Sequence, residues 1–222
     1  MTRLARFDAT HVAYFPPGIV ESLAAGGMVV YPTDTLYGLG VDPRSREGLR
    51  KLLALKRREG KKAIPLLLDD ADRASLWASH VSGKAARLME KFWPGALTVV
   101  MPAWPDVPEQ ITGGGGTIGL RVPDHPVARA LAKALGGAIT GTSANRAGNP
   151  GDWRTPEEIV LEFTGEVDWV LWDAPAASVR PEAEGTTRSP GSTVVRVEEN
   201  DIVLLREGAI PFRDITDFLK KG

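Results

Sequence analysis

Hydroxyl, carboxylate and glycine residues follow a short apolar run near the start of the chain. The run Met-Val-Val-Tyr at 28–31 leads directly into Pro-Thr-Asp-Thr-Leu-Tyr-Gly-Leu-Gly at 32–40. A β-branched run that ends in such residues is typical of a strand whose carboxyl end carries a ligand-binding loop. Thr and Asp also cap helices and glycine takes positive φ in turns, so a capped turn is the alternative interpretation. The residues alone leave both open.

A second transition of this kind lies further along the chain. Residues 138–140 predict a strand, and Gly-Thr-Ser-Ala-Asn follows at 141–145. Two hydroxyls and an amide after a strand suit phosphate oxygens or a metal-bound water, with a helix N-cap again as the alternative. The glycines at 113–116 predict either a plain connector or a flap beside such a site.

Positively charged residues occur at two positions that bear on function. Lys-Arg-Arg at 56–58 and Lys-Lys at 61–62 surround the end of a predicted helix, where cations also complement the macrodipole, so the cluster alone indicates a solvated helix end. Arg121 differs, because it interrupts an apolar strand at 118–122. A buried guanidinium needs an anionic partner, which either the protein or a ligand carboxylate or phosphate supplies.

Several classes of site are absent from the sequence. It contains neither a G-x-x-x-x-G-K-[ST] loop nor a G-x-G-x-x-G after a strand, and no G-x-S-x-G elbow. Cysteine is absent, and His11, His80 and His125 lack metal-ligand spacing, so we interpret them as structural or exposed. The acidic residues Asp69, Asp70 and Asp72 indicate the solvated start of a helix.

Length, charge and composition bound the class of protein. The chain has 222 residues, of which 43% are hydrophobic, so it can bury the core of one large domain. The net charge of −1 gives no overall attraction to nucleic acid or membrane. The first 17 residues lack the apolar core of a signal peptide, and no run approaches the ~18 apolar residues of a membrane span. We expect a cytoplasmic protein without a membrane partner.

The apolar periodicity predicts alternating helices and strands. Helices are expected at 19–25, 47–57, 69–77, 83–92, 126–135, 156–163 and 215–220, and strands at 28–31, 64–68, 97–101, 118–122, 138–140, 167–171, 193–197 and 202–205. Residues 102–117 are rich in Pro and Gly and predict a long surface loop. This order is typical of an α/β or α+β domain around a mostly buried sheet, with its binding loops at one end.

An ordered series of motifs resembles one known family, the threonylcarbamoyl-AMP synthases of the YrdC/TsaC kind. A single such motif occurs by chance, whereas the series is highly specific. It runs from about residue 26 to residue 210 and consists of PTDTLYGLG, the K-x-R of 56–58, FWPGALT, TIGLRVPDH, TGTSAN, GSTVVRV and LREGAI.

The resemblance implies a fold and an activity. The fold would be an open, twisted, mixed β-sheet flanked by helices around a large basic cavity. One domain would cover residues 1–222, with its core at about 12–211 and no extra carboxyl-terminal domain. The activity would condense L-threonine, bicarbonate and ATP, with Mg²⁺, into threonylcarbamoyl-adenylate and pyrophosphate. The product would pass to a threonylcarbamoyl-transferase complex that makes N6-threonylcarbamoyladenosine in tRNA.

The resemblance also implies roles for individual residues. Those expected around L-threonine are Thr35, Arg121, Gly141 and Ser192. Those expected around ATP are Arg58, Lys62, Thr117, Ser143, Asn145 and Arg206, and the catalytic pair would be Lys56 and Arg58. No protein side chain is expected to form a metal site of its own.

The chain departs from the family pattern at four positions. Glu59 and Ala63 stand where proline is common, and Arg196 stands where aspartate is common. Leu67 stands where many members carry a histidine that faces threonine. Two other functions stay open, namely an RNA-binding module that uses the basic cavity and a domain that makes a carbamoyl-adenylate for a carbamoyltransferase.

Overall fold

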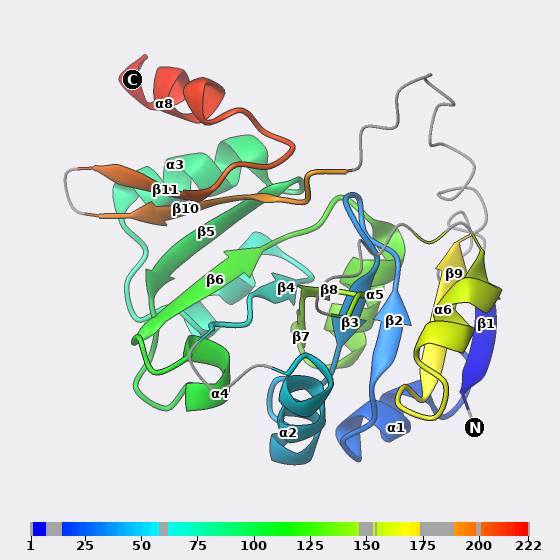
Figure 1. Cartoon of the computed structure of the whole chain (residues 1–222). Helices are drawn as coiled ribbons and strands as arrows, with labels where there is room; N and C mark the ends of the chain where they lie inside the picture. Colours follow the sequence, from blue (N-terminus) through cyan, green and yellow to red (C-terminus); the bar gives the residue numbers. More distant parts are fainter. Residues whose placement is uncertain are drawn as a thin grey trace, which may run out of the picture.

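The strands form two mixed sheets in the computed structural model, which describes residues 2–7, 15–57, 62–146, 153, 155–173, 189–198 and 201–221. The first sheet has the order β1 (Arg3–Phe7), β9 (Trp169–Asp173), β2 (Val29–Tyr31), β3 (Gly38–Gly40) and β8 (Thr142–Ser143). The second has the order β11 (Ile202–Arg206), β10 (Thr193–Val197), β5 (Leu97–Pro102), β6 (Thr117–Arg121), β4 (Leu66–Leu68) and β7 (Ala138–Thr140). Figure 1 shows them side by side, with β1 and β9 at one end of the molecule and α8 beyond β11 at the other.

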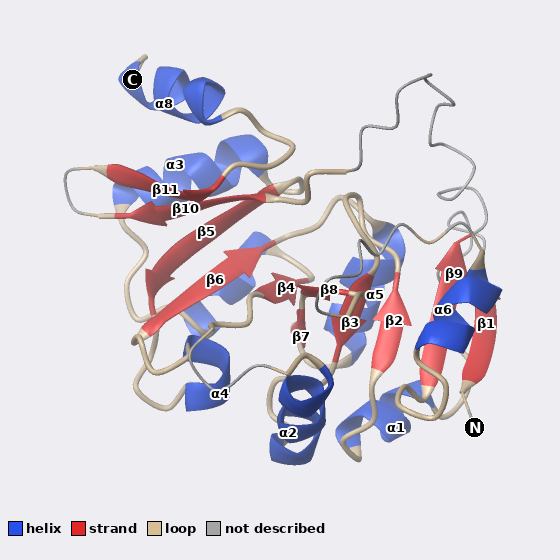
Figure 2. Cartoon of the chain, viewed as in Figure 1, coloured by secondary structure: helices blue, strands red, loops and turns tan. Residues whose placement is uncertain are grey.

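Helices cover the outer faces of both sheets (Figure 2). They are α1 (Ile19–Ala24), α2 (Arg46–Leu55), α3 (Gly83–Phe92), α4 (Glu109–Thr112), α5 (Pro126–Ala134), α6 (Pro156–Glu162), α8 (Phe212–Lys220) and a 3-10 helix at Ala71–Leu76. Helix α5 packs on β4 and β7, α3 lies between β5 and α8, and α6 packs on β9. Within the described ranges, no helix has the length and apolarity that crossing a bilayer requires.

The two sheets meet where β3 and β7 run beside one another. The backbone N–H of Thr140 donates to the carbonyl of Val41 over 3.2 Å, and the N–H of Val41 donates to Thr140 Oγ1 over 2.9 Å. The hydroxyl of Thr140 therefore accepts a hydrogen bond that a backbone carbonyl would accept in a continuous sheet. The backbone pairing is interrupted between β3 and β7, and the two sheets are separate there. The expected open, mixed α/β architecture is confirmed, with this division as its one refinement.

Alternate residues of the central strands enter two different clusters of the core. Val30 and Leu66 pack in the larger cluster, whereas Val29, Tyr31 and Leu67 pack in a second cluster beneath α1 and α5. Successive side chains of a strand point to opposite faces, so a strand that is buried on both faces reads as a continuous apolar run. This is why 28–31 and 64–68 showed no polar alternation.

Short polar side chains begin four of the helices, including α6, where Thr155 Oγ1 accepts the N–H of Glu158. Ser45 Oγ accepts the N–H of Gly48 at the start of α2, over 3.2 Å, and Ser82 plays the same part for α3. Asp70 accepts the N–H of Asp72 at 3.1 Å and caps the 3-10 helix. The interpretation of this acidic run as a helix start is confirmed, since an N-cap oxygen satisfies a backbone donor that the helix leaves unpaired.

The sequence missed three strands and one helix. Strands β1, β3 and β8 are short or glycine-containing, and each is stabilised by a distant partner, as β1 is by parallel pairing with β9. Within the predicted loop at 102–117, Pro108 is followed by α4, whose Ile111 is completely buried. One buried isoleucine, placed by tertiary packing, was not visible as a periodic pattern.

The motif at 32–40 is a strand, a loop and a second strand. Strand β3 returns antiparallel to β2, with Gly38 opposite Tyr31. A Cβ on Gly38 would lie 2.8 Å from the ring of Tyr31, whose hydroxyl donates to the carbonyl of Thr140 over 2.7 Å. Glycine is therefore needed at this position because a fully buried ring occupies the space of a side chain.

We predict that Gly38→Ala lowers the free energy of unfolding by about 1–3 kcal/mol, because the added methyl displaces the buried ring of Tyr31. Urea titration followed by circular dichroism measures the change. Gly83→Ala is the matched control, since a Cβ at that exposed helix start meets nothing within 4 Å. Equal stability of the two variants would contradict this explanation of the glycine.

Candidate functional site

A cavity of about 780 Å³ lies between loops of both sheets. Ten of the residues that the sequence predicted for the site line it, namely Thr35, Lys56, Lys62, Thr117, Arg121, Gly141, Ser143, Asn145, Ser192 and Arg206. The eleventh, Arg58, lies outside the described residues. The structure thus brings together segments that stand as much as 171 residues apart in the chain, from Thr35 to Arg206.

The topology explains how these segments meet. The loop between β2 and β3 carries Thr35, and strand β6 carries Thr117 and Arg121 at its two ends. The loop that follows β8 carries Asn145, and β11 ends at Arg206. Strand β8 pairs with β3 in the first sheet, and β10 pairs with β5 in the second. Loops and strand ends from both sheets therefore lie at the same cavity. The binding loops gather at one cavity, but not at one end of the sheet as expected, because Thr117 and Arg121 line the cavity from opposite ends of β6.

Arg121 is the most constrained cation of the cavity. Its residue is only 4% exposed, and its guanidinium makes three kinds of contact. Nε donates to the carbonyl of Gly95 over 2.8 Å, Nη1 donates to Thr35 Oγ1 over 3.1 Å, and Nη2 forms an ion pair with Asp34. A guanidinium has five N–H donors, so two are left without a partner in the described part of the chain.

The hydroxyl of Thr35 has a fixed direction. Thr33 Oγ1 donates its only proton to the carbonyl of Leu36 over 2.5 Å. In the 3.2 Å contact between the two threonine hydroxyls, Thr35 must therefore be the donor. Since Thr35 Oγ1 also accepts from Arg121, one lone pair remains. The side chain can accept one more hydrogen bond from a ligand in the cavity.

The FWPGALT motif supplies the carbonyl that holds Arg121. The N–H of Gly95 donates to the carbonyl of Val122, while its own carbonyl accepts from Arg121 Nε. A Cβ on Gly95 would lie 2.6 Å from the carbonyl oxygen of Phe92. Trp93 fixes the same turn through a 2.7 Å hydrogen bond from Nε1 to the carbonyl of Leu97. This motif therefore serves the site mainly by holding Arg121, and only its last residue, Thr98, lines the cavity.

Arg206 lies against neutral oxygens at another part of the wall. Its Nη2 donates to the carbonyl of Ser192 over 2.7 Å and to Ser192 Oγ over 3.1 Å. Ser192 Oγ in turn lies 2.9 Å from the hydroxyl of Thr98, a buried residue of β5. Partial burial lowers the pKa of Arg206, and the positive charge of Arg121 adds to this lowering. The two guanidinium groups thus repel each other across the site, and an anion between them relieves that repulsion.

Lys56 ties the end of α2 to the loop after β8. Its ammonium donates to the carbonyl of Ser143 over 2.9 Å, to the carbonyl of Asn145 over 2.6 Å and to Asn145 Oδ1 over 2.9 Å. Asn145 Oδ1 also accepts the hydroxyl of Ser143 over 2.6 Å. An ammonium group can only donate hydrogen bonds, so it orients the side-chain amide of Asn145 with its oxygen toward Lys56 and its NH₂ group away from Lys56. Lys56 therefore sets the geometry of the Ser-x-Asn segment.

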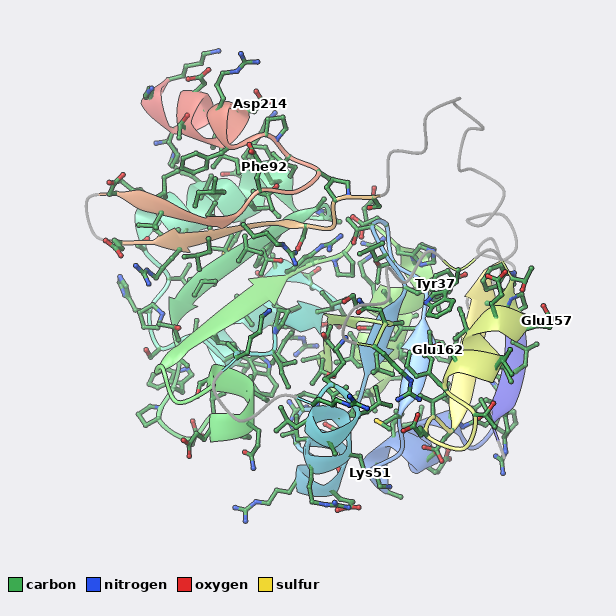
Figure 3. All side chains as sticks on the ribbon, viewed as in Figure 1. Tyr37, Lys51, Phe92, Glu157, Glu162 and Asp214 are labelled. Carbon is green, nitrogen blue, oxygen red and sulfur yellow. The ribbon has the colours of Figure 1, made fainter. Side chains whose placement is uncertain are left out.

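Arg146 lines the cavity beside this segment and was not predicted. Its guanidinium forms ion pairs with Glu162 and Glu166, and it lies 5.7 Å from the ring centre of Phe163. Figure 3 shows the labelled Glu162 on the side of α6 that faces the centre of the molecule. Helix α6 thereby holds a cation at the rim of the cavity.

Two apolar contacts complete the wall. Tyr37 lines the cavity and stacks on Trp172 of β9, with ring centres 5.2 Å apart; Figure 3 labels it near β2 and β9 of the first sheet. Leu67 is nearly buried opposite Gly141, where a Cβ would lie 2.6 Å from Leu67 Cγ. Glycine is needed at 141 because the leucine occupies that space. Leu67 also makes this part of the wall apolar.

The charged residues that line the cavity are all cations within the described ranges. They are Lys56, Lys62, Arg121, Arg146 and Arg206, and neither Asp nor Glu is among the lining residues. In the same part of the chain, no group of three or more His, Cys, Asp or Glu side chains is placed to hold a metal ion. The lining suits a polyanion, whose charge cations and oriented N–H donors neutralise.

Sequence reasoning missed three residues that shape the site. Asp34 and Thr98 lie inside motifs that were quoted, and Arg146 directly follows TGTSAN. Their contacts with Arg121, Ser192 and α6 join distant parts of the chain, so spacing gave no signal for them. His80 is exposed and His125 is buried, as interpreted, while His11 lies outside the described residues.

We predict that Lys56→Met lowers the free energy of unfolding by about 2–4 kcal/mol, because three oxygens lose a charged donor while the aliphatic stem remains. Lys62→Met is the matched control and should change stability by less than about 0.5 kcal/mol, since Lys62 is exposed. Chemical denaturation of both variants measures the difference. Equal effects would show that the Lys56 contacts contribute nothing to the fold.

Comparison with known proteins places this site in a family. The family model for Sua5, YciO and YrdC proteins, described as telomere recombination, matches residues 21–208. A threonylcarbamoyl-AMP synthase of Alkalilimnicola ehrlichii is 45% identical over 128 residues, which cover 58% of this chain and 66% of that protein. A threonylcarbamoyl-AMP synthase of Idiomarina loihiensis is 37% identical over 160 residues, which cover 70% of this chain and 84% of that protein.

A solved structure agrees with these relatives. The crystal structure of P. abyssi Sua5 complexed with L-threonine superposes with a TM-score of 0.80 at 25% identity, and the match covers 99% of this chain and 61% of that one. The matched part thus spans less than two thirds of P. abyssi Sua5 and of the A. ehrlichii protein. The resemblance that the motifs indicated is confirmed, and the chain belongs to the Sua5, YciO and YrdC family.

Proposed function

We propose that the protein is a threonylcarbamoyl-AMP synthase. It condenses L-threonine, bicarbonate and ATP into L-threonylcarbamoyladenylate, pyrophosphate and water. Support comes from relatives that carry this name and from the P. abyssi Sua5 structure, which is complexed with L-threonine. The observation that carries the proposal is the buried, fixed Arg121 at the wall of a cavity whose charged lining residues are all cations within the described ranges.

In this proposal Arg121 binds the carboxylate of L-threonine. Its two remaining N–H donors suit one carboxylate, and hydrogen bonds between charged groups are the stronger kind. Thr35 accepts a hydrogen bond from the same substrate, and Gly141 and Ser192 contact it through short groups. Leu67 offers the amino acid an apolar surface in place of an imidazole.

The triphosphate of ATP binds along the other cations. Arg206 and Lys62 carry charge without a carboxylate at salt-bridge distance in the described chain, so they are suited to phosphate oxygens. Thr117 and the amide nitrogen of Asn145 add neutral donors, and Lys56 keeps the segment of Ser143 and Asn145 in place. Arg58, in the K-x-R motif, completes this set as a further phosphate contact.

The reaction needs positioning more than a protein nucleophile. The amine of threonine takes up carbon dioxide as a carbamate, one oxygen of that carbamate attacks the α-phosphate, and pyrophosphate leaves. Cations that neutralise the phosphates and hold the two substrates in line supply most of what such a transfer requires. The absence of cysteine and of a G-x-S-x-G elbow from the sequence is consistent with this chemistry.

Magnesium enters this reaction as Mg–ATP, the form in which ATP is a substrate. Mg²⁺ is usually bound through substrate phosphates and water, with one or two carboxylates at most. Asn145 Oδ1 already accepts two hydrogen bonds, whereas the lone pairs of Ser143 Oγ remain available to a phosphate-bound ion or its water. The residues therefore fit an ion carried by the nucleotide.

The product would serve a cytoplasmic transferase complex that modifies tRNA. This role, the cytoplasmic location and any weak binding of RNA in the basic cavity are parts of the proposal that follow from the family. The net charge of −1 gives RNA no general attraction, so we assign the cavity to the small substrates.

The activity is tested by pyrophosphate release. Purified protein with ATP, magnesium and bicarbonate should release pyrophosphate only when L-threonine is added, and mass spectrometry should find threonylcarbamoyladenylate. Release with carbamoyl phosphate in place of L-threonine would indicate the carbamoyl-adenylate function instead. RNA binding that fades with salt and ignores ATP, without pyrophosphate release, would indicate the RNA-binding function.

We predict that Arg121→Ala weakens the binding of L-threonine by about 1.5–3 kcal/mol and that of ATP much less, because the lost contact is to a carboxylate. Arg206→Ala should show the reverse pattern and is the matched control. Isothermal titration of each ligand into each folded variant measures both. A loss by Arg121→Ala that is equal for the two ligands would mean that its partner is misassigned.

A further inference from the structure

The cations of the cavity fall into two groups by their partners. Arg121 is paired with Asp34 and Arg146 with Glu162 and Glu166, whereas Arg206 and Lys62 have no carboxylate at salt-bridge distance in the described chain. Asp34 does not line the cavity, although Thr33 and Thr35 on either side of it do. Its side chain is 16% exposed and lies behind the guanidinium. The cavity therefore has a charge-balanced arginine where Arg121 lies, and cations without a carboxylate partner where Arg206 and Lys62 lie.

This difference matters because the two arginines are close enough to interact. The charge of Arg121 contributes to lowering the pKa of Arg206, so their fields overlap in the cavity. Without Asp34, both ends would attract a triphosphate, and ATP would have two competing places to bind. With Asp34 in place, a polyphosphate near Arg121 meets a nearby negative charge, and this repulsion grows with the charge of the ligand.

A single carboxylate is affected far less. It carries one charge, and it can use the two N–H donors that Arg121 retains after Gly95, Thr35 and Asp34 have taken three. The planar guanidinium can lie between two carboxylates, one from the protein and one from the ligand, because its donors point in fixed and different directions. The pair thus discriminates between anions by their charge.

We propose that Asp34 is a specificity-determining residue that makes the Arg121 end of the cavity accept a carboxylate and reject polyphosphate. Asp34 acts through Arg121 and touches neither substrate. The inference rests on the proposed function for the identity of the two substrates. The electrostatic effect depends only on Asp34 and Arg121, so it can be measured by ligand binding without any reaction.

The first measurement uses inorganic tripolyphosphate as the probe. Asp34→Asn keeps the shape and the acceptor oxygen of the side chain but removes its charge. We expect the dissociation constant for tripolyphosphate, from isothermal titration, to fall about tenfold relative to the unchanged protein. Glu47→Gln is the matched control, because it removes one carboxylate from an exposed ion pair with Arg50 on α2. A change below twofold, or the same change in the control, would overturn the proposal.

A double-variant cycle tests whether the effect passes through Arg121. In the Arg121→Ala background, Asp34→Asn should change tripolyphosphate binding by less than twofold, because without the guanidinium nothing draws tripolyphosphate close to residue 34. Asp34→Glu keeps the charge and should bind tripolyphosphate as the unchanged protein does. Asp34→Ser provides a second uncharged variant, and near-ultraviolet circular dichroism confirms the fold of each. A full tenfold effect without Arg121 would contradict the mechanism.

Kinetics separate this inference from the proposed function. In Asp34→Asn, ATP should become an inhibitor that competes with L-threonine, whereas a merely structural defect would lower turnover without such competition. Threonine-dependent pyrophosphate release by the unchanged protein, together with unaltered tripolyphosphate binding in Asp34→Asn, would leave the function intact and overturn the role of Asp34. Tighter tripolyphosphate binding in a protein that never releases pyrophosphate would overturn the function alone.

Discussion

The structure depends on keeping one buried guanidinium charged and oriented. Burying a charge is costly unless it is paired and hydrogen-bonded, and Arg121 is 4% exposed at the end of an apolar strand. Three groups from two separate segments meet this requirement: the carboxylate of Asp34 and the hydroxyl of Thr35 in one loop, and the carbonyl of Gly95 in another. The hairpin loop, the FWPGALT turn and strand β6 must therefore be in place together. Fold and site are coupled because the same contacts stabilise both.

The rest of the cavity follows the same principle of fixing donors before a ligand arrives. Lys56 orients Ser143 and Asn145 through three hydrogen bonds, and Ser192 holds Arg206 through its carbonyl and hydroxyl. Donors fixed in this way need little reorganisation when charge develops on a phosphate. The two sheets contribute because each supplies only part of the wall, and their seam at β3 and β7 places the parts side by side.

The sequence predicted what local patterns determine and missed what distant contacts determine. Long periodic helices such as α3 and apolar strands such as β5 were predicted closely, because burial on a regular face leaves a regular pattern. The ordered motifs identified ten lining residues of the cavity. The pairing of β1 with β9, the ion pair of Asp34 with Arg121 and the hold of α6 on Arg146 left no such pattern. Each joins segments that only the folded chain brings together.

The central claim is that Arg121, held by its three partners, binds the carboxylate of an amino acid. The most direct test is isothermal titration of the unchanged protein with L-threonine and with L-threonine amide, in which a neutral amide replaces the carboxylate and an NH₂ group replaces one acceptor oxygen. The claim predicts that the amide binds at least about tenfold more weakly, since a charge-assisted contact is lost. Equal affinity for the two compounds would contradict it and would assign Arg121 to the fold alone.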